Sequence, residues 1–402
     1  MTSASPAAAA ADDTRHVRVP TFAMAVAAGI AVATLYYNQP MLGLIEATFS
    51  ESASAGLVPT ASQIGYALGL FFLVPLGDMI DRRRLIVGQF LALAAALVVA
   101  AAAPSATVLI LGSALTGIAA TTAQQIIPFA ATLARPERRG ATIGTVMSGL
   151  LCGILLSRTV AGFVATHFGW RAMFWAAVPL ALLAAALMAF ALPAGRPTAD
   201  LRYPAALRSL AHLWTGEPRL RLATATQAAL FASFSAFWTV LALRLQEPQF
   251  GLGADVAGLF GVVGAMGVLA APLAGRLADR RGPGFIIAVG VSLVLAAWFF
   301  FGFWAGLAGL AIGVVLLDLG VQGSMVPNQH MIYALRPEAR SRINTVFMTG
   351  IFVGGALGSL GATFAYGFGG WHGVCLLGGG LALVSCLLQA VGARNRRSGP
   401  AH

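Results

Sequence analysis

Two ionisable side chains stand deep inside long apolar stretches of this sequence. Arg158 lies in the stretch 141–166 and Asp318 in the stretch 306–334. A charge at the centre of a membrane helix costs about 2.5 to 3.5 kcal/mol on insertion scales, so each charge needs a partner or an aqueous cavity. At about 1.5 Å per residue, Arg158 lies roughly 12 Å and Asp318 roughly 18 Å from the outer end of its predicted helix. The two side chains can therefore face each other.

Such a pair has two interpretations. A structural salt bridge only stabilises the fold, whereas a functional pair moves a proton or binds a charged substrate. An internal repeat, described below, aligns Arg158 with Ser359 and Asp318 with Gly117, so neither charge has a counterpart in the other half. This favours function: Asp318 is our candidate protonation site, with Arg158 as its partner or as an anchor for an anionic group.

Further polar side chains follow Asp318 in the sequence and recur in the matching helix of the first half. Gln322, Met325 and Gln329 follow Asp318 at i+4, i+7 and i+11, which places all four on one helix face. Polar stripes are tolerated in a membrane where they line a water-filled cavity. The matching helix of the first half carries further candidates for this cavity, namely Thr121, Gln124 and Gln125.

A second polar cluster lies toward the outer end of the first apolar stretch. It consists of Tyr36, Tyr37, Asn38 and Gln39, and Trp238 occupies the corresponding region of the seventh stretch. Aromatic side chains at this depth are also typical of the interfacial belt. The adjacent amides favour a cavity lining, so all five residues are candidates for substrate contact.

The elements that position these residues follow from composition. The chain is 58% hydrophobic and 10% charged, whereas a soluble domain carries about 25% charged residues. We predict an all-α membrane protein with twelve spans of about 20 residues each. Their predicted ranges are 21–45, 57–77, 85–103, 107–134, 141–166, 171–193, 222–244, 254–277, 284–304, 306–334, 343–368 and 371–392.

The chain repeats itself at an offset of 201 residues, and Arg135-Pro136-Glu137 recurs as Arg336-Pro337-Glu338. Two copies of one six-helix bundle about a central site are typical of secondary transporters. The predicted organisation is a disordered cytoplasmic tail 1–20, a bundle 21–193, a cytoplasmic linker 194–221, a second bundle 222–392 and a cytoplasmic tail 393–402.

Arginine gives the predicted orientation. All 25 basic residues are arginine, and most fall in the two tails, the linker and alternate hairpin loops. By the positive-inside rule both termini are cytoplasmic, which predicts a multi-pass protein of the cytoplasmic (inner) membrane. The net charge of +11 therefore reflects topology and contact with the lipid bilayer, and we predict no nucleic-acid partner.

The segment Gly275 to Gly282 reads Gly-Arg-Leu-Ala-Asp-Arg-Arg-Gly and resembles the signature loop of the major facilitator superfamily. The copy in the first half keeps Asp78 but departs at Val74, Met79 and Asp81.

The resemblance implies a latch on the cytoplasmic side, in which each loop aspartate meets the start of a helix in the other half. Asp78 is then expected near Arg342, and Asp279 near Thr142. The alternative is that both loops only carry positive-inside charge. The latch candidates are Asp78, Arg82, Gly275, Asp279, Arg280 and Gly282.

The fifth helix, with Gly149 and Gly153, is similar to the glycine-rich helix of proton-driven drug and metabolite exporters in this superfamily. It departs from that pattern because Ser157-Arg158 replaces the usual Gly-Pro pair. The resemblance implies a secondary active transporter that moves a small organic molecule by alternating access, in a proton-coupled efflux. The alternative is an importer or facilitator of an organic anion held by Arg158.

A membrane-embedded sensor or enzyme is less favoured, because neither a catalytic cluster nor an output domain is visible. The sequence contains no lysine, which excludes a Walker loop. The histidines and cysteines have no metal-ligand spacing, so we predict no metal and no cofactor. The expected partners are a small-molecule substrate, protons and lipid, and the chain is expected to act as a monomer.

Overall fold

The fold is described from a computed structural model of the chain. The structure describes residues 6–50, 54–193, 203–264, 270–304 and 306–397. Every regular element in these residues is a helix, and they contain no β-strand. The all-α prediction is therefore confirmed.

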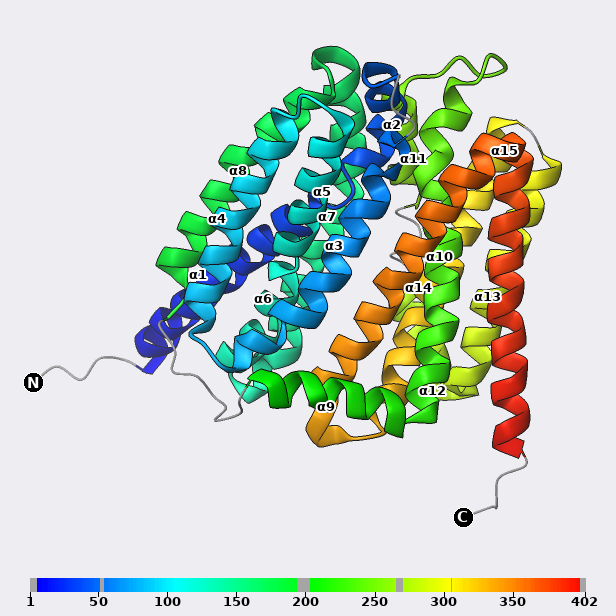
Figure 1. Cartoon of the computed structure of the whole chain (residues 1–402). Helices are drawn as coiled ribbons and strands as arrows, with labels where there is room; N and C mark the ends of the chain where they lie inside the picture. Colours follow the sequence, from blue (N-terminus) through cyan, green and yellow to red (C-terminus); the bar gives the residue numbers. More distant parts are fainter. Residues whose placement is uncertain (1–5, 51–53, 194–202, 265–269, 305, 398–402) are drawn as a thin grey trace, which may run out of the picture.

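The first half lies on the left of Figure 1 and the second half on the right. The first half contains α1 (Pro6–Ala33), α2 (Asn38–Thr48), α3 (Val58–Leu73), α4 (Arg82–Ala101), α5 (Ala106–Ala120), α6 (Thr122–Leu133), α7 (Arg139–Phe168) and α8 (Trp170–Ala191). The second contains α10 (Pro218–Gln246), α11 (Ala254–Gly264), α12 (Ala270–Arg281), α13 (Pro283–Phe303), α14 (Leu307–Tyr333) and α15 (Arg340–Arg397). Short 3-10 turns occupy Ala55–Leu57, Pro75–Asp78, Pro136–Arg138 and Pro337–Ala339.

Helix α9 (Tyr203–Gly216) lies across one end of the bundle, below both halves in Figure 1. It buries Leu210 and Leu213, and the hydroxyl of Tyr203 donates a hydrogen bond of 2.8 Å to the carbonyl oxygen of Phe72 in α3. Part of the predicted linker is thus a helix that is attached to the first half. We call this end of the molecule the α9 end.

Ten helical segments of the described residues are long and apolar enough to cross a membrane, by length and composition. The segment Arg340–Gly392 covers two predicted spans, which meet where Gly370 adopts a positive φ of 54° that favours glycine. The predicted eighth span contains α11 and the first part of α12, and residues 265–269 between them lie outside the description. Helix α1 begins at Pro6, within residues 1–20 for which the sequence predicted disorder.

Glycines bring the first and fifth predicted spans into backbone contact. A Cβ atom added to Gly153 in α7 would lie 2.6 Å from the Cα of Gly29 in α1. The second half has the same arrangement, since a Cβ on Gly358 in α15 would lie 2.6 Å from the Cα of Ala232 in α10. Small residues at such crossings allow close van der Waals packing where no hydrophobic effect drives helix association.

Replacing Gly153 by leucine is therefore expected to destabilise the first half, because α1 must move away from α7. Overpacking of this kind typically costs about 1 to 3 kcal/mol or more. Thermal unfolding of the purified protein measures the loss. Gly144→Leu is the matched control, since it lies in the same helix and a Cβ there meets nothing within 4 Å. Equal unfolding temperatures for the two variants would contradict the close crossing.

Candidate functional site

Arg158 is buried at the junction of the two halves, with 3% of its surface exposed. Its Nε donates a hydrogen bond of 2.8 Å to Oε1 of Gln39. Its guanidinium carbon lies 4.6 Å from the ring centre of Tyr36 and 4.1 Å from that of Trp238. A cation over an aromatic face is attracted by the negative charge density of the ring. Two aromatic rings, one from each half, therefore hold the arginine.

Local backbone features create the room for this side chain. Helices α1 and α2 are separated by a turn at residues 34–37, which begins with Thr34 bonded to the carbonyl of Ala31. Helix α11 crosses α7 closely at two glycines: a Cβ on Gly258 would lie 2.5 Å from the carbonyl oxygen of Arg158, and one on Gly261 would lie 3.1 Å from the Arg158 Cβ. Larger residues at either position would push α11 away from the site.

Asp318, in α14 of the second half, is 7% exposed. A Cβ on Gly264 would lie 3.2 Å from the Asp318 Oδ2 and 3.1 Å from Cζ2 of Trp238, so both side chains contact the same glycine. The charges of Asp318 and Arg158 are close enough to interact. No direct ion pair between them occurs among the described residues.

Trp238 lies close to both charged side chains. The guanidinium of Arg158 lies over its ring face, and the carboxylate of Asp318 lies near the ring edge that carries Cζ2. An aromatic ring is negative on its face and positive at its edge, so both placements are favourable. Within the described residues, Nη2 of Arg158 is buried without a hydrogen-bond partner, whereas Oδ2 of Asp318 and Nε1 of Trp238 are buried close enough to interact with each other but outside good hydrogen-bond geometry. Unpaired buried groups are costly, which indicates that a substrate or water completes this site.

The other predicted cavity residues fall into two groups. Gln322 and Gln329 are half-buried on α14 and make no hydrogen bond to any described residue, while Gln124 donates one of 3.3 Å to the hydroxyl of Tyr66. Thr121 and Gln125 also bond within the first half, where Gln125 Nε2 donates to the carbonyl of Leu73 at 2.7 Å and Thr121 accepts from Gln89. Asn38 donates to Ser62 at 2.7 Å, and Tyr37 is buried in the core.

Sequence reasoning missed a network that joins the halves at the depth of Arg158. The hydroxyl of Ser359 accepts hydrogen bonds from Thr60 at 3.0 Å and Thr239 at 2.9 Å. Gln63 accepts one of 3.2 Å from Ser235. The repeat contained the signal, because Ser359 aligns with Arg158 and Gly264 aligns with Gln63. Ser359, which contacts both halves, thus occupies the position equivalent to that of Arg158.

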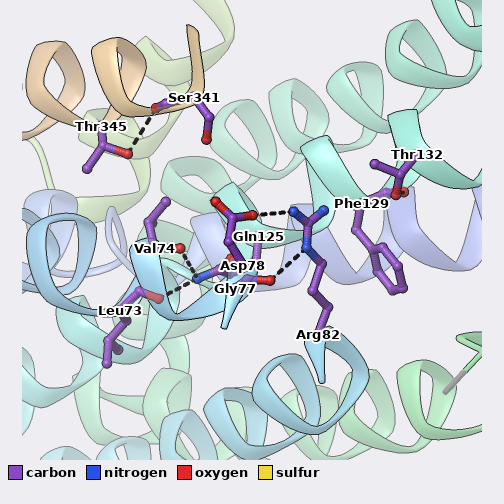
Figure 2. Close-up of polar contacts among 10 residues, drawn as sticks. All are labelled: Leu73, Val74, Gly77, Asp78, Arg82, Gln125, Phe129, Thr132, Ser341 and Thr345. Carbon is purple, nitrogen blue, oxygen red and sulfur yellow. Dashed lines mark hydrogen bonds and ion pairs between the residues drawn. The ribbon is translucent and has the colours of Figure 1, made fainter. Parts of the chain in front are cut away.

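The loop that carries Asp78 lies at the α9 end. Asp78 forms an ion pair of 2.6 Å with Arg82, whose Nε also donates to the carbonyl of Gly77 at 2.8 Å. Figure 2 shows these contacts beside the start of α15, where Ser341 and Thr345 lie. Asp78 lines a pocket of about 190 Å³ together with Ser341, Arg342, Thr345 and residues of α9. The carboxylate therefore faces the region where the latch was predicted.

The second predicted latch loop is described only in part. Gly275 and Arg280 lie in α12, and Gly282 follows that helix with a positive φ of 83°, which favours glycine. The side chain of Asp279 lies outside the described residues.

Replacing Asp78 by asparagine is expected to loosen closure at the α9 end without unfolding the protein. The ion pair with Arg82 is half-exposed, so we expect only about a two-fold rise in the labelling rate of a cysteine placed at Gln329. Glu137→Gln, at an exposed turn, is the control. A larger effect is expected for Asp279→Asn, whose loop keeps the complete signature. Unchanged labelling in both variants would contradict the latch.

Comparison with known proteins agrees with this architecture. Residues 22–334 match the profile of the Major Facilitator Superfamily. The chain is 47% identical over 369 residues to the uncharacterized transporter YgaY of Escherichia coli O157:H7, covering 91% of this chain and 93% of the relative. It is 32% identical over 258 residues to a chloramphenicol resistance protein of Streptomyces lividans, covering 61% and 62% respectively.

A solved structure supports the same fold. A bacterial homolog of the human lysosomal transporter Spinster, in an inward-facing and unoccupied conformation, superposes with a TM-score of 0.77 at 15% identity and covers 96% of this chain and 99% of that one. The profile match, the relatives and the fold agree, and the chain belongs to the major facilitator superfamily of membrane transporters.

Proposed function

We propose that this transporter moves a small organic molecule out of the cell in exchange for protons, with Asp318 as the site that takes up and releases the proton. One observation carries the proposal: Arg158 and Asp318 are buried opposite charges on opposite halves, near each other but not directly paired. Their separation can change when the halves rock, and alternating access in this class of transporter depends on such rocking.

The coupling follows from the energetics of a buried carboxylate. With Arg158 close, the negative charge of Asp318 is balanced, and the ionised form is tolerated. If the halves move apart or a substrate occupies Arg158, the lone buried charge becomes unfavourable and binding of a proton relieves it. Proton uptake on one side and release on the other then accompany each exchange of states.

The topology that we propose for this cycle has twelve spans with both termini and α9 in the cytoplasm of the inner membrane. The arginine distribution supports it, since basic loops favour the cytoplasmic side. The outward direction rests on one relative, whose name describes resistance to chloramphenicol. A protein that confers resistance to a drug by transport must lower the drug concentration inside the cell.

Reconstituted vesicles test the proposal. A panel of labelled compounds that includes chloramphenicol is offered to proteoliposomes with and without a proton gradient. We expect at least one compound to accumulate against its own gradient, and a protonophore to abolish the accumulation. Movement that does not depend on the proton gradient would contradict proton coupling.

The second candidate is a facilitator or importer of an organic anion. The observation that favours it is the unpaired Nη2 of Arg158, a charged donor buried without a partner in the described residues. A substrate carboxylate is a strong acceptor for such a donor. For this candidate, net movement of organic carboxylates should not respond to a proton gradient, and it should be equal in Asp318→Asn and in the wild-type protein.

A further inference from the structure

The two halves meet closely at the end of the molecule opposite α9, where α2 lies in Figure 1. The hydroxyl of Thr363 in α15 donates a hydrogen bond of 3.0 Å to the carbonyl oxygen of Gly56 in the first half. The amide of Gln246, at the end of α10, lies so close to Gly43 of α2 that a Cβ on this glycine would overlap with it. We call this contact the outer seam, because the proposed topology places it on the outer side of the membrane.

Glu46, directly after the predicted span 21–45, is a partly buried carboxylate in the outer seam. A Cβ on Gly56 would lie 2.9 Å from its Oε1 and 2.7 Å from Cγ2 of Thr363, so the carboxylate lies beside the hydrogen bond that closes the seam. Glu46 also lines a cavity of about 280 Å³ between the halves, whose rim includes the exposed residues Ser50 and Gly367. Water on the outer side can therefore reach this side chain.

The cation at the end of α10, Arg244, is paired with another carboxylate. Arg244 forms an ion pair with Glu247. Glu247 also accepts hydrogen bonds from Tyr366 at 2.8 Å and from Gln249 at 3.0 Å. Tyr366 is close enough to interact with Glu46 as well as with Glu247. The charge of Glu247 is thus balanced, whereas Glu46 forms no ion pair and no hydrogen bond with any residue that the structure describes.

The other described charged and titratable groups around this end lie on α7, α8, α11 and α15, or deeper in the protein. They are His167, Arg171, Asp255 and His372, with Tyr36, Tyr37, Arg158 and Asp318 deeper, toward the candidate site. His167 bonds within its own helix, and Arg171 donates to a backbone carbonyl between α4 and α5. Arg158 bonds to Gln39, about two turns from Glu46 along α2. No cation among the described residues therefore balances Glu46 in the closed seam.

Closing the seam favours the neutral form of Glu46. A carboxylate that loses part of its water without gaining a cation is more stable with a proton bound. The closed seam then binds this proton more tightly than the open seam, so closure is stabilised at low pH and weakened as the pH rises. Ordinary glutamate has a pKa of about 4.3, so a range from about pH 5 to about pH 8 spans the expected change.

We propose that Glu46 is a second proton-binding site, through which acid on the outer side closes the outer seam. A proton enters through the cavity beside Ser50 and binds to a carboxylate oxygen of Glu46. At higher pH the proton returns to the outer water, and the negative charge that remains makes the seam open more readily. In the proposed exchange cycle, closure of the outer end then follows the arrival of a proton from outside. This role of Glu46 is independent of whether Asp318 couples transport.

Distances between spin labels test the role of Glu46 without substrate and without a proton gradient. The labels are attached through Ala47→Cys and Gly369→Cys, at exposed positions of the two halves, in nanodiscs that contain the full chain. A Cβ at Gly369 meets nothing within 4 Å, so this label has room. The three native cysteines are replaced by alanine, and Asp318→Asn removes the other candidate proton site. We expect the ratio of short to long distances to be at least three-fold higher at about pH 5 than at about pH 8.

Neutral replacements of Glu46 should remove this pH response. Glu46→Gln keeps the shape of the side chain and should give the short distance at both pH values. Glu46→Met is a second neutral variant, for which the same result is expected. Asp255→Asn, which removes a carboxylate at the start of α11, is the control and should keep the full response.

A pH response that persists unchanged in Glu46→Gln and Glu46→Met would overturn the assignment, and so would the absence of any response in the protein that retains Glu46. Because the background already carries Asp318→Asn, a response that Glu46→Gln abolishes cannot come from Asp318. The labels report closure and not transport, so failure of proton-coupled transport leaves this test intact.

Discussion

Replacing Asp318 by asparagine is expected to abolish accumulation of substrate driven by a proton gradient, while exchange of labelled for unlabelled substrate continues. Asparagine keeps the shape of the side chain and its contact with Gly264 but cannot bind and release a proton. The binding site therefore remains, and only the coupling is lost. We expect at least a hundred-fold fall in gradient-driven accumulation, measured as the ratio of internal to external substrate in proteoliposomes.

Two matched variants support this measurement. Asp255→Asn removes a carboxylate at the start of α11, away from the site, and should leave accumulation unchanged. Asp318→Glu keeps a carboxylate and should retain part of the coupling. If Asp318→Asn still concentrates substrate against its gradient, this carboxylate is not the coupling site.

Removing Arg158 alone is expected to destabilise the protein more than removing Arg158 and Asp318 together. In Arg158→Gln the carboxylate stays buried without a nearby cation, and breaking a fully buried pair in this way costs about 3 to 5 kcal/mol. The double variant Arg158→Gln with Asp318→Asn contains no unbalanced charge. It should therefore unfold at a higher temperature than Arg158→Gln, and it should not transport against a gradient.

The recovery will be incomplete, because Arg158 also bonds to Gln39 and stacks on Tyr36 and Trp238. Gln39→Leu is a useful comparison, since it removes the hydrogen bond but leaves both charges. Thermal unfolding of the single and double variants decides the matter. Losses that simply add would show that the two charges are energetically independent.

The sequence alone predicts the positions of most of the long apolar helices. Helical length and apolar composition place most of the spans within a few residues, and the glycines at 369 and 370 mark where the last two spans meet. The depth of Arg158 and Asp318 in their helices predicts that they approach each other. Both residues are buried, and each lies close to Trp238.

The remaining features depend on packing between helices, which periodicity does not encode. Gln125 is a candidate for the cavity lining from its type and position, but its side chain donates to the backbone carbonyl of Leu73. The contact of Trp238 and Asp318 with Gly264 depends on the close approach of α11, which sequence spacing cannot specify. A short interfacial helix in the linker was expected, but its bounds were not, because burial of Leu210 and Leu213 against other helices stabilises it.

The most direct test of proton exchange records proton and substrate movement in the same vesicles. Proteoliposomes carry a pH-sensitive dye inside and receive a compound that the transport panel has identified as a substrate. In the wild-type protein, we predict that substrate movement in one direction produces proton movement in the other, and that Asp318→Asn exchanges substrate with no change in internal pH. Substrate accumulation by the wild-type protein without any proton movement would contradict the account.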